Sequence, residues 1–168
     1  MSTRRPDYKH TSTIIDDRTV RVERVFDAPR DLVWRAHSEP ELVAQWWGRG
    51  NKVDVERFEF EKGGHWRFVE HHESGSDGFE GRFRAIEPKT LISQTFEWDG
   101  LPGHPIIDTT VLSDENGGRA TKISVTSHFF NQEERDGMAA AGAEAGMAQG
   151  YAALDALLER MKGEASRR

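Results

Sequence analysis

The chain has 168 residues, no cysteine and a formal net charge of −6 at neutral pH. This length suits one compact domain, in which roughly 70% of the surface of the unfolded chain can be buried. The lack of cysteine excludes disulfides and thiolate metal sites. The acidic balance argues against a nucleic-acid partner, because phosphate binding needs clustered Lys and Arg.

The first 17 residues are polar and lack periodicity, which predicts a flexible tail or a loosely attached extension. They contain only Ile14 and Ile15 where a signal peptide would need an apolar stretch. No run in the chain approaches the ~20 apolar residues that cross a bilayer. We therefore expect a soluble, cytoplasmic protein with no membrane partner.

Residues 19–26, TVRVERVF, alternate apolar and charged side chains and predict a half-buried strand. The DAP of residues 27–29 is a natural helix start, since Asp caps free N–H groups and Pro fits the first turn. Segments 30–37 and 41–47 then predict two short helices, separated at Pro40.

Six further strands are predicted between residue 52 and residue 129, because apolar alternation is interrupted by turn-rich stretches such as KGG, ESGSDG and SDENGG. They cover residues 52–60, 65–72, 79–86, 90–98, 106–112 and 119–129. Short connections between successive strands imply an antiparallel meander.

Beyond Asn131 the composition shifts to Ala, Glu, Met and Leu. One apolar stripe at helical spacing predicts a long amphipathic helix; it consists of Met147, Tyr151, Leu154, Leu158 and Met161. The predicted domain spans residues 18–162, and residues 163–168 are expected to be a disordered tail.

A sheet of about seven strands has one face to cover, and the terminal helix has one stripe to bury, so the two must meet. The predicted class is α+β: a curved antiparallel sheet wrapped on the long C-terminal helix, with two short helices after the first strand. A curled sheet and a cylinder seldom fit without a gap, so we expect a space between them.

Strand parity and the helical stripe nominate the residues that line this space. The candidate ligand-binding set is Trp47, Trp66, Phe68, Phe83, Phe96, Trp98, Met147 and Tyr151. Each of these side chains suits an ordinary apolar core equally well. The polar Glu70, His72 and Gln94 share the inward parity, and buried polar groups need partners, which include side chains, water or a ligand.

Trp46 and Trp47 stand side by side in ELVAQWWGRG, and neighbouring helical residues point about 100° apart. Trp46 continues the apolar stripe of Leu42 and Val43, so we expect it to anchor the short helix to the sheet. Trp47 is then the residue expected at the mouth of the cavity. The alternative is that both tryptophans are packing residues.

Four segments of the chain resemble successive signatures of the SRPBCC (START-like) superfamily. They are RVERVFDAPRDLVWRAHSEPELVAQWWGRG, EKGGHWRF, DGFEGRFRAIEPKTLISQTFEW and GMAQGYAALDALLERM, within about residues 19–162. The likeness is to the branch related to the C-terminal domain of the activator of Hsp90 ATPase, and FDAPRDLVW, WWG and the GG before the third strand are its most specific parts.

The resemblance implies the helix-grip (START/Bet v 1-like) fold. Members of the superfamily hold apolar small molecules, act as cyclases or other enzymes, or stimulate a chaperone, so the fold does not choose a function. The co-chaperone owes its activity partly to a separate N-terminal domain, and these 168 residues leave no room for it. Stimulation of Hsp90 is therefore not the expected activity.

The function expected first is binding of a small, largely apolar molecule between sheet and helix, without chemistry and without a cofactor. The alternatives are an enzyme of cyclase or hydrolase type that uses Glu70 or His72, and a chaperone-related interaction module. The sequence contains no nucleophile motif or phosphate loop, and a single bulge would turn both Glu70 and His72 to solvent.

The seven histidines do not predict a metal site. His71 and His72 are adjacent on a strand and point to opposite faces, and His65 lies about 20 Å from His71 along an extended strand. No HxH or HExxH spacing occurs.

Gly142, Gly146 and Gly150 recur every fourth residue and form a small-residue strip on the predicted helix. Glycine within a helix costs about 0.5–1 kcal/mol relative to alanine, which indicates a compensating steric reason. The strip suits a close approach to the sheet or to the second subunit of a homodimer, or it leaves room for a ligand.

Overall fold

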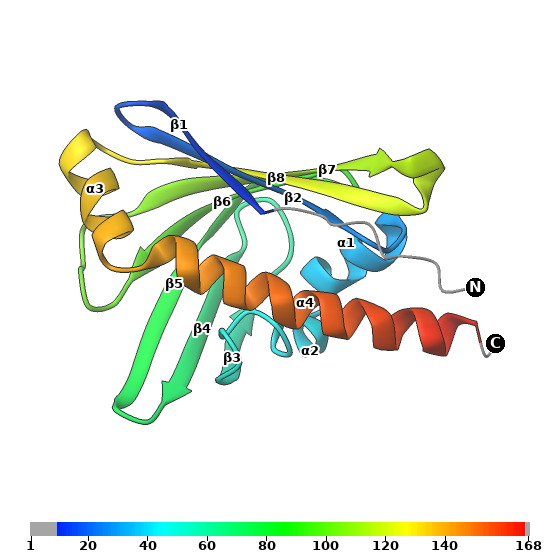
Figure 1. Cartoon of the computed structure of the whole chain (residues 1–168). Coiled ribbons are helices and arrows are strands. Elements are labelled where there is room, and N and C mark those ends of the chain that lie inside the picture. Colours follow the sequence, from blue (N-terminus) through cyan, green and yellow to red (C-terminus); the bar gives the residue numbers. More distant parts are fainter. Residues whose placement is uncertain (1–9, 167–168) are drawn as a thin grey trace.

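Eight antiparallel strands form one curved sheet, and a long helix crosses its concave side in the computed structural model, which describes residues 10–166 (Figure 1). The strands are β1 (Thr11–Asp16), β2 (Thr19–Phe26), β3 (Lys52–Phe58), β4 (His65–His72), β5 (Gly75–Glu87), β6 (Leu91–Trp98), β7 (Ile106–Glu115) and β8 (Ala120–His128). Their order across the sheet is β1-β2-β8-β7-β6-β5-β4-β3. The predicted α+β helix-grip architecture is confirmed.

The eighth strand is β1, which lies inside the stretch predicted to be a flexible tail or extension. Its residues are exposed on both faces, so the segment carries no periodic burial that its sequence would reveal. The strand is held by its pairing with β2, as in the Ser12–Val22 pair. Residues 1–9 of the predicted tail lie outside the described part of the chain.

Helices α1 (Arg30–Ser38) and α2 (Pro40–Val43) follow β2, as predicted. Regular helix ends at Val43, earlier than the predicted residue 47. The N–H groups of Trp46 and Trp47 still donate to the Val43 carbonyl, so the chain continues as tight turns up to Gly50.

The C-terminal helical region is divided into α3 (Gln132–Ala140) and α4 (Ala143–Ala165). Asn131 caps α3 by accepting a hydrogen bond from the Glu134 N–H, and Gly142 adopts a left-handed conformation (φ 87°) at the break. Helix α4 extends three residues into the segment 163–168, which was predicted to be disordered. Within residues 10–166, no helix is long and apolar enough to span a membrane.

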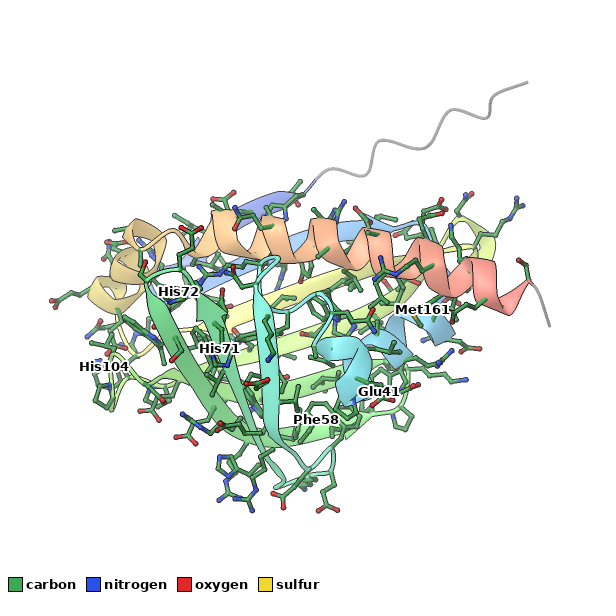
Figure 2. The ribbon with its side chains drawn as sticks, turned by 90° about the horizontal axis from the view of Figure 1, so that it is seen from below. Glu41, Phe58, His71, His72, His104 and Met161 are labelled. Atoms are coloured by element: carbon green, nitrogen blue, oxygen red, sulfur yellow. The ribbon has the colours of Figure 1, made fainter. Side chains whose placement is uncertain are left out.

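Cross-strand register assigns each side chain of the sheet to one face. Val22 pairs with Val125 and Phe26 with Thr121, and these residues face α4 together with Leu112 of β7. They pack against α1 and the C-terminal half of α4, which lies at the Met161 end of the molecule (Figure 2). A second buried cluster lies on β3 to β6.

Candidate functional site on the concave face of the sheet

Trp47 lies at the centre of an aromatic cluster formed with four residues of β4, β5 and β6. We call Trp47, Trp66, Phe68, Phe79 and Phe96 the aromatic cluster. The ring of Trp47 lies 5.0 Å from that of Phe68, 5.1 Å from that of Phe79 and 6.4 Å from that of Phe96. Trp47 therefore brings the turn after α2 onto the concave face of the sheet.

Trp46 points the other way and packs between helices. Its indole N–H donates to the Ala36 carbonyl at 2.9 Å, and its ring lies 4.9 Å from His37 and 6.2 Å from Tyr151. Trp46 is the buried anchor expected from its spacing, but it anchors the segment to α1 and α4 rather than to the sheet. The residue that meets the sheet is Trp47.

Gly146 and Gly150 of α4 face the turn that carries these tryptophans, whereas Gly142 lies at the break before the helix with no heavy atom within 4 Å of an added Cβ. A Cβ on Gly146 would lie 2.9 Å from Cδ of Arg49, and one on Gly150 would lie 3.4 Å from the Trp46 carbonyl oxygen. The glycines thus allow close approach of the turn after α2 to α4. The sequence predicted the sheet, a second subunit or a ligand as the neighbour of these glycines.

Arg49 also closes over Glu70, which is the most buried charged residue of the sheet at 1% exposure. Arg49 donates to both carboxylate oxygens, at 3.1 and 2.9 Å, and the Asn51 side chain donates to Oε1 at 2.8 Å. Glu70 keeps the inward parity predicted for it and is not turned to solvent. Its oxygens are occupied by three donors, so it is not poised as a catalytic base.

His72 and Trp98 meet at Asp77, at the rim of the concave face. His72 Nε2 lies 2.9 Å from Asp77 Oδ2, and the Trp98 indole N–H donates to Oδ1 at 3.0 Å. Trp98 is 39% exposed, which corrects the prediction that it lines the interior. It ends β6, and its ring lies over Gly100, where an added Cβ would fall 2.3 Å from a ring carbon.

The structure divides the remaining predicted lining residues between two clusters. Phe83 lies beside the aromatic cluster, with its ring 5.7 Å from Phe58 and 5.1 Å from Phe60. Tyr151 belongs to the cluster beneath α4, where its ring packs 5.2 Å from Phe26, and Met147 packs against the same cluster.

Gln94, which the sequence predicted to face inward, belongs to a polar row across the concave face whose other two members were missed. In the ladder, Gln94 of β6 stands opposite Asp108 of β7, which stands opposite Ser127 of β8. We call these three residues the polar row. The Ser127 hydroxyl donates to Asp108 Oδ1 at 2.6 Å. Asp108 shares its parity with Leu112 in the segment IIDTTVL, so alternation along this strand was the signal that could have found it.

Burial raises the pKa of the Asp108 carboxyl to about 6, although the hydrogen bond from Ser127 opposes this shift. Burial and, secondly, the negative charge of Asp108 raise the pKa of the Tyr151 hydroxyl above its usual range. The phenol of α4 and the carboxyl of β7 therefore interact electrostatically.

Coverage of the concave face is uneven. Beneath the C-terminal half of α4, Phe26 and Ile123 are completely buried and Leu112 is 1% exposed. Beneath its N-terminal half, inward-facing side chains remain partly accessible; we call this region the open half. It comprises Asp77, Phe79, Gln94, Phe96, Asp108, Thr110 and Ser127.

The exposure of side chains also falls along helix α4, from its N-terminal half to its C-terminal half. Residues 143–149 are exposed or partly exposed, whereas Leu154, Leu157 and Leu158 are buried. In Figure 2 the two ends of the gradient are marked by His72, beneath the start of α4, and Met161 near its end.

Two hollows also occur on the surface, and neither is lined by a residue of α4. One, of about 410 Å³, lies between α2 and β3 and includes Glu41 and Phe58 (Figure 2). The other, of about 550 Å³, lies beside Thr19 and His128. Within residues 10–166, no group of three or more His, Asp or Glu side chains is placed to hold a metal ion.

Fold and concave face together define a helix-grip protein, and solved structures share this architecture. A Rhodobacter sphaeroides protein superposes with a TM-score of 0.81 at 25% identity, over 90% of this chain and 99% of that one. A Chromobacterium violaceum protein has a TM-score of 0.71 at 26% identity, over 84% and 97% of the two chains. An Arthrobacter aurescens protein reaches 0.81 at 22% identity, over 89% and 91%.

A family model described as "Activator of Hsp90 ATPase homolog 1-like protein" matches residues 27–159. The chain belongs to this family, which confirms the resemblance seen in the sequence. No curated protein matches the chain.

Proposed function

We propose that the protein binds a small, largely apolar molecule between the N-terminal half of α4 and the open half of the concave face. The observation that carries the proposal is the uneven coverage of the sheet: partly accessible Phe79 and Phe96 face inward, while the other end of the same face is sealed. Exposed aromatic surface on a concave wall is typical of ligand sites.

The aromatic cluster supplies the apolar wall of the proposed site. Phe79 and Phe96 lie 5.4 Å apart with their planes inclined by 30°, and Trp47 packs edge-on against Phe79. Flat or elongated hydrocarbon groups would replace water against these rings, which favours binding by burial of apolar area. The net charge of −6 disfavours an anionic ligand.

A neutral fluorescent probe, N-phenyl-1-naphthylamine, tests this proposal directly. We expect a saturable rise in its emission with one site per chain, because the dye brightens when it leaves water. Phe79→Ala should weaken binding by about tenfold, as expected from the loss of apolar contact. Phe130→Ala is the matched control, because Phe130 is 75% exposed and lies outside the proposed site.

Two results would overturn the proposal. One is an emission change that does not saturate; the other is equal binding by the wild type and Phe79→Ala. The alternative that uses Glu70 as a catalytic base is not supported, because Arg49 and Asn51 occupy its oxygens.

A further inference from the structure

The polar row places an acidic group inside an otherwise apolar wall. On one side of the row along the strands lie Ile92 and Val125, and on the other lie Phe96 and Ile106. Directly opposed residues in an antiparallel pair have Cβ atoms about 4.5–5.5 Å apart. Asp108 is therefore flanked across the strands by the Gln94 amide and the Ser127 hydroxyl, and along its own strand by Ile106 on one side and Thr110 on the other.

Asp108 has little internal compensation for its negative charge. Its one hydrogen bond among the described residues is the one from Ser127 to Oδ1. Among residues 10–166, no lysine or arginine forms an ion pair with it; the guanidinium of Arg24, on β2, binds Asp155 and the Tyr151 carbonyl. His128 is the one group whose positive charge lowers the Asp108 pKa.

A carboxylate in such surroundings needs a donor, because burying a charge without a partner costs several kcal/mol. The second oxygen of Asp108 is free of protein donors within the described chain, and the residue is partly accessible from the open half. A ligand that enters there would reach it.

The aromatic cluster begins next to the polar row. Phe96 follows Gln94 by two residues on the same face of β6, which is about 7 Å along the strand. The Phe96 ring in turn lies 5.4 Å from that of Phe79. A ligand with an aromatic body and a head group about 7 Å from it would contact both the aromatic cluster and the polar row.

We propose that Asp108 binds the protonated amino group of a cationic amphiphile, whose apolar body lies against Phe79 and Phe96. This inference rests on the proposed function and specifies the chemical class of its ligand. The carboxylate supplies a charge-assisted hydrogen bond and the ring faces favour a nearby cation.

Three matched probes test the inference: 2-(1-naphthyl)ethylamine, 2-(1-naphthyl)ethanol and 1-naphthylacetic acid, titrated calorimetrically at pH 7.5. They share the naphthyl body and differ in the head group. We expect the amine to bind the wild type about tenfold or more tighter than the alcohol, with the acid weakest. In Asp108→Asn the amine and the alcohol should bind alike.

Asp114→Asn is the control, because Asp114 belongs to the same strand but pairs with Arg30 at the surface. It should retain the preference for the amine. The comparison of amine with alcohol in the wild type does not depend on any variant folding correctly.

The results of these titrations distinguish the two proposals. If the alcohol binds and the amine gains nothing, or if Asp108→Asn keeps the preference, the role of Asp108 is wrong while the proposed function stands. If the acid binds best, the charge assignment is wrong. If none of the three probes binds and N-phenyl-1-naphthylamine also fails to bind, both proposals are overturned.

Discussion

Arg49 and Glu70 form a two-pronged ion pair that fastens the turn after α2 to strand β4. The guanidinium donates from Nε to Oε1 at 3.1 Å and from Nη2 to Oε2 at 2.9 Å. The carboxylate is buried while the arginine side chain remains 40% exposed. The pair therefore lies at the boundary between the interior and water, beside the start of α4.

Arg49→Leu should destabilise the fold by about 1–3 kcal/mol, because it leaves the buried Glu70 with only Asn51 as a donor. The exposure of Arg49 keeps the loss below that of a fully buried pair. Urea unfolding measures the effect. Arg57→Leu breaks the exposed pair with Glu59 and should cost less than about 0.5 kcal/mol. Equal losses in the two variants would contradict the role given to Arg49.

Gly146→Leu should destabilise the protein by about 1–2 kcal/mol, because the new side chain displaces Arg49 and costs more than helix propensity restores. Gly163→Ala is the counterpart on the same helix. No heavy atom lies within 4 Å of a Cβ added there, so we expect a gain of about 0.5–1 kcal/mol. Thermal denaturation of both variants checks the prediction, which fails if Gly146→Leu raises the melting temperature.

Trp47→Ala should cost about 2–4 kcal/mol, since it removes the ring that joins α2 to Phe68, Phe79 and Phe96. Trp47→Phe keeps part of this contact and should cost less. Trp98→Ala, at the exposed rim, should cost under about 1 kcal/mol. The measurement is the free energy of unfolding in urea. A larger loss for Trp98→Ala than for Trp47→Ala would show that the cluster is not centred on Trp47.

Asp108→Asn should change how stability depends on pH. The pKa of Asp108 is about 6 in the folded chain against an ordinary value of 3.8, so the folded state holds its proton up to a higher pH than the unfolded state. The wild type therefore loses stability as pH rises from about 4 to 6, and the asparagine variant avoids that loss. The benefit should reach about 1–3 kcal/mol at pH 7 relative to pH 4.

Urea unfolding of wild type and Asp108→Asn at several pH values between 4 and 8 measures this benefit. The groups that act on Asp108 are Ser127, which donates a hydrogen bond to it, and His128 of β8, whose positive charge lowers its pKa; Asp108 in turn raises the pKa of Tyr151 on α4. Because the positive charge of His128 lowers the pKa of Asp108, His128→Gln serves as the background in which the comparison is repeated. An unchanged difference between the two proteins across the range would contradict the raised pKa.

Alternation along the strands predicted most of the interior correctly. Trp66, Phe68 and Phe83 face inward and are buried, because in a strand the parity of a residue fixes its face. Parity does not determine whether another element covers a residue. Trp98 therefore shares the parity of Phe96 and still lies exposed at the end of β6. Strand β1 escaped prediction because both of its faces are exposed and its sequence carries no alternation of burial.

The polar features of the site depend on partners far away in the sequence. Glu70 has the inward parity of its strand, but its burial is made possible by an arginine 21 residues earlier in the chain. Asp108 had the inward parity of its strand, yet its significance depends on Gln94 and Ser127 standing opposite it in the neighbouring strands. The pairing register between strands determines which residues stand beside Asp108. The sequence pattern of a single strand does not reveal it.

The place of β8 between β2 and β7 has a consequence for how the chain acquires its structure during synthesis. Arg21 of β2 pairs with Thr126 of β8 across a separation of 105 residues, so β2 lacks its inner neighbour until β8 has left the ribosome. Contacts of such long range slow folding, because the intervening loop must close first. The nascent chain must therefore keep its first long strand from pairing wrongly until β8 has been made.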